Sequence, residues 1–273
     1  MTNTETHDTG QYTSKTLEQL REGQKRFQDR NQATITEISK EYSARLASEN
    51  EPDNPEKILA RALNMIDRPQ KVLLQVMGYE TARQIIWKVG NAILAQSGNA
   101  WQVDEQQASI IESLIRYFIN DPSGRFELSK GICLFGDVGR GKTFLFKVIQ
   151  VFCNASKIEN RQFKFANCAD ISDRVLWAKE NMAEVIAGYC DGAWFFDDLG
   201  NEPSAVKSYG NEIQVMERIL MQRYPKFVNG FCITHVTTND TPDELETKYG
   251  TRLADRAKEM FNFVKLPGES KRK

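Results

Sequence analysis

The feature that most constrains the fold is a glycine-rich run, Gly136-Asp-Val-Gly-Arg-Gly-Lys-Thr143, which directly follows the apolar segment Ile132-Cys-Leu-Phe135. The run has the spacing G-x-x-x-x-G-K-[ST], which joins the end of a β-strand to the first turn of a helix. Its glycines let the backbone curl so that successive N–H groups point at phosphate oxygens, and the helix N-terminus adds partial positive charge. The pattern predicts a strand, a phosphate-binding loop and a helix, in that order.

The whole loop is expected to surround the phosphates of ATP. Lys142 brings a point charge to the β- and γ-phosphates, and the Thr143 hydroxyl is a ligand for Mg²⁺. The predicted nucleotide-binding residues are Gly136, Asp137, Val138, Gly139, Arg140, Gly141, Lys142 and Thr143.

Two consecutive acids, Asp197 and Asp198, follow the wholly apolar run Ala193-Trp-Phe-Phe196. Ligands gather at the carboxyl ends of parallel strands, so these carboxylates are expected beside the loop. Asp197 is the predicted Mg²⁺ partner, directly or through water, and Asp198 is the candidate to orient and polarise the attacking water. Taken alone, two acids after a buried strand are equally compatible with an ordinary turn; the phosphate-binding loop favours the catalytic interpretation.

From residue 125 onward, short apolar segments alternate with amphipathic ones. This alternation predicts an α/β fold, with a parallel sheet covered by helices on both faces. The expected strands are 131–135, 162–167, 193–196 and 231–236, and the expected helices are about 142–154, 170–188, 208–224 and 242–248. A further helix is expected after the capping-box-like start Asp104-x-x-Gln107.

The N-terminal part of the chain has a different pattern. Residues 1–14 are expected to be a disordered tail, and Lys15 to Ser48 has the narrow apolar stripe of a long helix. Such a stripe suits a coiled coil or a docking helix, or a surface helix on its own domain. A turn-rich linker, Glu49 to Pro55, precedes further helical patterns up to Gln96. We therefore expect an all-helical, partner-binding region at 15–100 and the ATPase domain at 101–273.

Composition narrows the chemistry. Five cysteines form no Cys-x-x-Cys pair and are expected to be buried hydrophobes, and only two histidines are present, so catalysis must use carboxylates, lysine, arginine and backbone. No apolar run approaches the about 20 residues that span a bilayer, and no leader pattern is seen, so a cytoplasmic protein without membrane association is expected. Residues 248–273 carry eight Lys or Arg and three Asp or Glu, a pattern more typical of a solvated tail than of a nucleic-acid contact.

Several motifs together resemble those of the DnaC/IstB-like AAA+ ATPases, over about residues 103–273. They are the segment Lys130-Gly-Ile-Cys-Leu-Phe-Gly136 with its loop, Phe196-Asp-Asp-Leu-Gly-Asn-Glu-Pro203, Gln222-Arg-Tyr224, Thr237-Thr-Asn239, Tyr249-Gly-Thr-Arg-Leu-Ala-Asp-Arg256 and Gly268-Glu-Ser-Lys-Arg272. No single later motif is specific, but their order is.

The resemblance implies roles for three further residues. Asn239 would be the sensor-1 residue beside the nucleotide, Arg256 the arginine finger that reaches the ATP of a neighbouring subunit, and Arg272 a sensor-2-like nucleotide contact. Arg252 would be a second basic residue of the Arg256 element. The plain alternatives are a turn asparagine and solvent-exposed arginines. Most AAA+ enzymes carry Glu where this chain has Asp198, which implies slow or partner-dependent turnover.

By this resemblance the protein is an ATPase that uses ATP and Mg²⁺, self-associates through ATP-bridged interfaces, and acts on single- or double-stranded DNA. The leading hypothesis is a loader of a replicative helicase. The first alternative is a helper ATPase that assists a transposase. The second is a scaffold that uses ATP to set its conformation and hydrolyses little of it.

Overall fold

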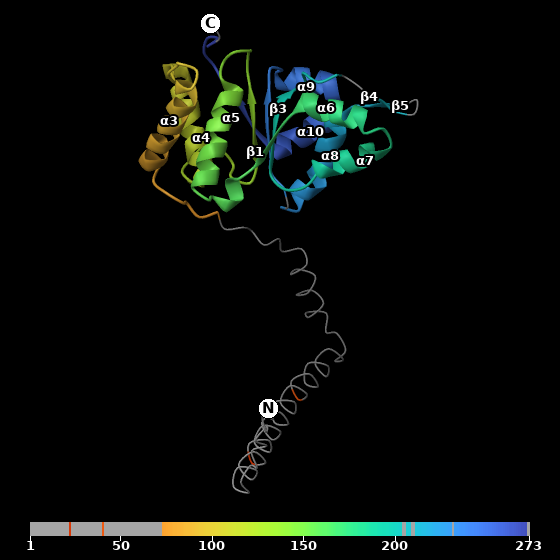
Figure 1. Cartoon of the computed structure of the whole chain (residues 1–273), viewed down its shortest axis with the longest axis horizontal. Helices are drawn as coiled ribbons and strands as arrows, with labels where there is room; N and C mark the ends of the chain where they lie inside the picture. Colours follow the sequence, from red (N-terminus) through yellow and green to blue (C-terminus); the bar gives the residue numbers. More distant parts are fainter. Residues whose placement is uncertain are drawn as a thin grey trace, which may run out of the picture. The chain divides into compact units, whose positions relative to one another are not determined.

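Five parallel strands form the central sheet of the protein (Figure 1). The computed structural model describes residues 73–203, 206–208, 211–230 and 232–271, together with Glu22 and Lys40. The strands lie in the order β2-β3-β6-β1-β7. Their bounds are β1 Gly131–Phe135, β2 Lys164–Asn167, β3 Trp194–Leu199, β6 Thr234–Thr238 and β7 Phe261–Lys265.

Helices cover both faces of this sheet, as Figure 1 shows. One face carries α3 (Tyr79–Ala95), α4 (Glu105–Phe118) and α5 (Lys142–Ala155); the other carries α6 (Cys168–Trp177), α7 (Met182–Gly188), α8 (Val215–Val228) and α10 (Thr251–Met260), with α9 (Pro242–Tyr249) beside α10. Strand alternation builds the two cores, because Ile132 and Leu134 join the first and Cys133 joins the second. The predicted fold class, a parallel sheet flanked by helices, is confirmed.

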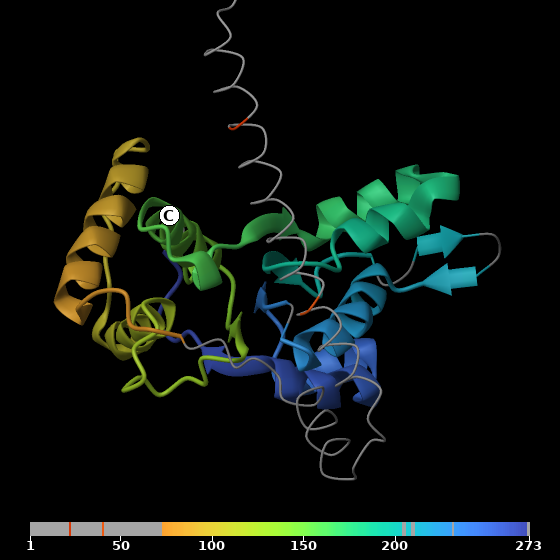
Figure 2. The same ribbon diagram turned by 90° about the horizontal axis from the view of Figure 1, so that it is seen from below.

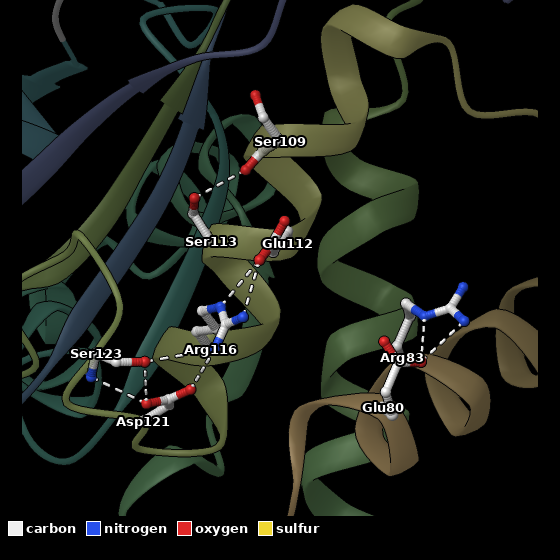
Figure 3. A network of polar contacts seen from close by, with 8 residues as sticks. All are labelled: Glu80, Arg83, Ser109, Glu112, Ser113, Arg116, Asp121 and Ser123. Carbon is white, nitrogen blue, oxygen red and sulfur yellow. Dashed lines mark hydrogen bonds and ion pairs between the residues drawn. The ribbon is translucent and has the colours of Figure 1, made fainter.

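A polar network holds the turn that follows α4 (Figure 3). The Arg116 guanidinium donates to Glu112, one helical turn earlier, and to Asp121, at 2.7 Å. Asp121 in turn accepts hydrogen bonds from the backbone N–H and the hydroxyl of Ser123. These bonds lower the pKa of the Asp121 carboxyl. The network fixes the chain just before it enters β1.

Helix α3 packs into the same core as the sheet. Its buried Ala82 and Ile86 lie in one apolar cluster with α4 and α5, and Trp101 covers Gly90 so closely that a Cβ there would stand 2.3 Å from the ring. The compact unit begins at Arg68. The boundary expected between residues 100 and 101 falls inside this unit, because α3 buries its apolar face on α5. The partner-binding role of 15–100 stays a prediction.

Strand β7 was missed by the sequence analysis, which expected only four strands and interpreted the basic end as a solvated tail. Residues 251–265 instead form α10 and then β7, which pairs with β1 from Gly131↔Phe261 to Phe135↔Lys265. No turn separates the two elements, since Phe261 is both the C-cap of α10 and the first residue of the strand. No glycine or proline therefore marked the start of this strand.

Two expected helices also differ. The stretch 170–188 is interrupted by a 3₁₀ turn at Lys179–Asn181, which separates α6 from α7. The stretch 208–224 begins as an antiparallel hairpin, β4 (Val206–Ser208) and β5 (Asn211–Ile213), and becomes helical only at Val215. Figure 2 shows this hairpin extending from the body of the protein. Gly210, between its strands in the sequence, disfavours a helix interior.

The other expected elements either overlap an observed helix or strand or fall outside the described residues. Helices α5 and α9 and strand β1 agree with their predicted bounds to within one residue, and α4 begins where predicted. Strands β2, β3 and β6 overlap their predicted ranges but differ from them by two or three residues at one end or both. Apart from Glu22 and Lys40, the described residues do not include the expected tail 1–14, the helix at 15–48, the linker at 49–55 or the helical stretch up to residue 72. Arg272 also lies outside them. No helix in the described ranges combines the length and the apolar character that crossing a membrane requires.

His235 lies in the first core, among aromatic rings. Its ring centroid is 5.2 Å from that of Phe163 and 5.3 Å from that of Phe118, and its Nδ1 accepts a hydrogen bond from the Ile132 N–H at 3.1 Å. Burial lowers the pKa of His235 well below its ordinary 6.5, and the positive charges of Arg161 and Arg223 lower it further. The imidazole is therefore neutral in the folded protein.

This depressed pKa predicts a loss of stability in mild acid. Below about pH 6.5, His235 binds a proton in the unfolded chain but stays neutral in the folded chain. The free energy of unfolding should therefore fall by up to about 1.4 kcal/mol for each unit by which the pH is lowered. Urea unfolding between pH 5 and 7.5 measures the slope. His235→Asn, which offers an acceptor but no titrating group, should have a shallower slope by that amount; equal slopes in both proteins would contradict the prediction.

Candidate nucleotide-binding site

The carboxyl ends of three neighbouring strands form the site. In the sheet register, Phe135 of β1 and Leu199 of β3 both lie opposite Thr238 of β6. The loop after β1, the acids near the end of β3 and the asparagine after β6 are therefore brought to one edge, as the parallel fold predicts.

The loop at 136–143 has the shape of a phosphate cradle. Gly136 has a φ of 144° and approaches the chain after β7 so closely that a Cβ would stand 2.7 Å from the Leu266 carbonyl oxygen. Gly141, with a φ of 88°, is the N-cap of α5, and a Cβ there would meet nothing within 4 Å. Within the part of the chain that the structure describes, no side chain caps the first N–H groups of α5. These backbone donors at a helix N-terminus suit an anion such as a phosphate.

Lys142 lies inside the cradle and is only 5% exposed. Its Nζ donates to the carbonyl oxygens of Gly136 (2.6 Å) and Asp137 (3.0 Å) and to Asn239 Oδ1 (2.8 Å). Burial lowers the pKa of Lys142, and the negative charges of Asp198, Asp137 and Asp197 oppose that shift. When a phosphate enters the cradle, the Lys142 ammonium can donate its hydrogen bonds to phosphate oxygens in place of these protein oxygens. Little side-chain entropy is lost in that exchange, because the side chain is already ordered.

Asp197 and Thr143 form the second part of the site. Asp197 Oδ1 accepts the Thr143 hydroxyl at 2.8 Å and the Thr237 hydroxyl at 2.5 Å. Hydroxyl and carboxylate oxygens at this separation fit the hard-oxygen coordination of Mg²⁺. Within the described residues, no group of three or more His, Cys, Asp or Glu could hold a metal ion by itself. An ion here would thus need nucleotide or water oxygens as further ligands.

Asn239 and Asp198 complete the cluster. Asn239 accepts from Lys142, while Asp198 stands in the left-handed region with a φ of 57°, unusual for a residue with a side chain. Beyond them, Lys248 on α9 donates to the Gly200 carbonyl oxygen (2.8 Å) and to Asp240 (2.6 Å). Lys248 thereby ties the segment after the acids to the segment after Asn239.

Comparisons with known proteins can be set beside this geometry. No protein-family model matches the chain, and the search of curated proteins also finds no match. Solved structures do match. The DnaC helicase loader is 18% identical over 61% of this chain and 94% of its own, with a TM-score of 0.46. DnaI is 20% identical over 60% and 88%, with a TM-score of 0.44. AMPPCP-bound DnaA from Aquifex aeolicus is 16% identical over 62% and 49%, with a TM-score of 0.43. The matches thus include one protein named as a helicase loader, DnaC, and one named as a replication initiator, DnaA. DnaC is one of the two proteins after which the resembled family is named.

The segment after β7, which leads to the predicted nucleotide contact Arg272, runs directly against the loop. After β7, the Leu266 N–H donates to the Phe135 carbonyl oxygen, and the Lys271 N–H donates to the carbonyl oxygen of Gly139, both at 2.8 Å. Arg140 donates back to the Leu266 carbonyl oxygen at 3.1 Å. The segment 266–271 therefore frames the phosphate cradle with backbone hydrogen bonds.

Gln107 joins this segment to the loop. Its backbone N–H donates to Asp104 Oδ1 at 2.9 Å, the N-cap bond that the sequence predicts, but its side chain makes no reciprocal cap. Instead, Nε2 donates to the carbonyl oxygens of Pro267 (2.9 Å) and Arg140 (3.3 Å). The sequence alone does not predict this contact, because Gln107 and Pro267 are 160 residues apart along the chain.

We predict that Gln107→Glu weakens ATP binding by about tenfold, because an ionised carboxylate cannot donate to either carbonyl oxygen and both lose a buried partner. Isothermal titration with ATP measures the affinity. Gln106→Glu is the matched control, since it adds the same charge at the neighbouring exposed position and should bind like the wild type. Equal effects of the two substitutions would assign the loss to charge alone.

Two of the arginines that the resemblance singles out, Arg252 and Arg256, are on α10. Arg256 is on α10, where its guanidinium lies 4.6 Å from the centroid of the Tyr224 ring and contacts Met221 Sδ. Tyr224 in turn donates its hydroxyl to Glu259 at 2.8 Å. Arg252, on the same helix, is exposed. The roles of Arg256 and Asp198 in catalysis, and of Arg272 in nucleotide binding, stay predictions.

Proposed function

We propose that the protein is an ATPase of the DnaC/IstB-like AAA+ type, and that its role is to load a replicative helicase onto DNA. The observation that carries the nucleotide part is the pair of 2.8 Å hydrogen bonds that join the loop to the two neighbouring strands, Lys142 to Asn239 and Thr143 to Asp197. They bring a buried ammonium, a hydroxyl–carboxylate pair and an asparagine together at one loop, which supports the proposal.

In this proposal the reaction is attack of water on the γ-phosphate of ATP, giving ADP and phosphate. Lys142 and the α5 N-terminus bind phosphate oxygens, and Thr143 and Asp197 hold Mg²⁺, which neutralises charge on the phosphates. Asp198 orients and polarises the water, and Asn239 positions that water or senses the γ-phosphate. The short reach of Asp198 favours slow turnover that a partner accelerates.

The helicase-loading role rests on the motif resemblance. The residues at 15–100 are its proposed source of partner contacts, and Arg256 is proposed to complete the site of a neighbouring subunit. Because α3 belongs to the compact unit that starts at Arg68, the segment to remove in a test is 1–67 rather than 1–100.

A two-part experiment tests the proposal. Steady-state ATPase assays with and without single-stranded DNA test hydrolysis, and pull-down of the host's replicative helicase by the full chain and by the 1–67 deletion tests the partner. We expect slow, Mg²⁺-dependent hydrolysis and helicase capture by the full chain alone. ATP binding without hydrolysis, even with helicase and DNA present, would instead favour an ATP-regulated scaffold. Capture of a transposase but not of the helicase would favour the transposition helper.

A further inference from the structure

The two acids of the site lie on an irregularity of the sheet. Strands β3 and β6 pair in register at Phe196↔Val236 and again at Leu199↔Thr238. Two residues, Asp197 and Asp198, thus stand on β3 where β6 has only Thr237. An extra residue of this kind bends the strand, re-aims a side chain and leaves backbone groups without their ladder partners.

The extra residue has a specific conformation. Asp198 takes a φ of 57°, a region that residues with a Cβ adopt reluctantly and that persists only where the surroundings impose it. Something must therefore hold the backbone at Asp198, and the sheet ladder is interrupted at this position.

The Thr237 side chain occupies the gap. Its Oγ1 accepts a hydrogen bond from the Asp198 N–H at 3.0 Å and donates to Asp197 Oδ1 at 2.5 Å. Thr237 is fully buried. A hydroxyl has one hydrogen to donate and lone pairs to accept, so this one group satisfies both bonds at once. It links the backbone of one acid to the carboxylate of the other.

We infer that Thr237 is a positioning residue for the proposed ATPase reaction, whose hydroxyl holds the irregular turn of β3 and thereby orients both Asp197 and Asp198. This inference rests on the proposed function. Hydrogen-bond partners of metal-binding carboxylates set their orientation, and losing one commonly lowers metal affinity or activity by about 10- to 100-fold. Thr237 should therefore affect Mg²⁺ use and turnover more than ATP binding.

Thr237→Val tests this with almost no change in shape. We expect kcat to fall by about 10- to 100-fold, KM for ATP to change little, and the Mg²⁺ concentration for half-maximal binding of a fluorescent ATP analogue to rise by about tenfold. Thr237→Ser keeps the hydroxyl and should restore both quantities toward wild type.

The neighbouring Thr238 supplies a matched control. It is equally buried and on the same strand, but its hydroxyl accepts the N–H of Asp240 at 3.0 Å. Thr238→Val should lose comparable thermal stability and keep kcat and the Mg²⁺ dependence. If Thr237→Val behaves like Thr238→Val in both readouts, Thr237 only satisfies a buried N–H and the inference is wrong.

Two further outcomes are informative. Should Thr237→Val not fold, Thr237→Cys replaces the hydroxyl with a weak hydrogen-bonding group of similar size, and the same comparison with serine applies. If the wild-type chain binds ATP but does not hydrolyse it, the catalytic part of the proposed function fails. The Mg²⁺ titration of nucleotide binding then still tests whether Thr237 positions the metal-binding carboxylate, because this measurement does not require turnover.

Discussion

Lys142→Ala should lower ATP affinity by at least about 100-fold and abolish turnover. The substitution removes the one buried ammonium of the cradle, and charge-assisted bonds to phosphate contribute about 1.5–3 kcal/mol each. Three protein oxygens, on Gly136, Asp137 and Asn239, lose their donor as well. We therefore expect the free energy of unfolding to fall by about 1–3 kcal/mol while the fold is retained.

Titration calorimetry with ATP and thermal unfolding measure these two effects. Lys147→Ala is the matched control, because Lys147 is exposed on the same helix and its ammonium lies over the Phe165 ring, 5.7 Å from the centroid. It should bind ATP as the wild type does. Unchanged ATP affinity in a folded Lys142→Ala protein would remove the basis for the nucleotide site.

Mixing two inactive variants should restore activity if sites are shared between subunits. Lys142→Ala subunits keep Arg256, and Arg256→Ala subunits keep the loop, so some mixed interfaces contain one intact copy of each half. A finger arginine contributes about 10³ to 10⁵ in rate, so each variant alone should be near background. Random assembly at equal concentrations should recover at most roughly a quarter of wild-type activity, rising with protein concentration.

Lys258→Ala controls for a general effect of changing α10, since Lys258 is exposed on that helix and pairs with Asp255. It should leave activity intact. A mixture that co-assembles, by light scattering, yet stays as inactive as its components would show that Arg256 does not act across an interface.

Local signals in the sequence were sufficient for the parts of the site that one short segment encodes. The loop at 136–143 and the acids at 197 and 198 each follow an apolar strand, so parallel pairing alone predicts that they meet. The structure brings Thr143 of the loop to Asp197 as that argument requires. The position of Lys142 at a junction of loop and helix predicts a solvent-facing side chain, but Lys142 is buried, because protein carbonyl oxygens and Asn239 surround its ammonium.

The features that could not be predicted from the sequence depend on contacts between residues that are far apart along the chain. Thr237 belongs to the quoted segment Thr237-Thr-Asn239, but the sequence assigns it no role, because a threonine near a strand end is ordinary. Only the mismatch between β3 and β6 gives its hydroxyl two partners. Gln107 was visible as a helix-start residue, but its side-chain partners lie on other elements. Strand β7 lacked a preceding turn, and its register beside β1 follows from tertiary packing rather than from local pattern.

The position of β7 has a consequence for the order in which the molecule can assemble during synthesis. Strand β1 lies between β6 and β7, and Arg140 of its loop is bonded to Leu266, 126 residues further on. While the ribosome makes those intervening residues, the apolar strand Gly131–Phe135 at first has neither of its neighbours and, once β6 has been made, still lacks β7. Closing such a long loop is slow, and unpaired apolar strands are prone to association. Nascent chains halted before residue 261 should therefore require chaperone protection and should be unable to retain nucleotide.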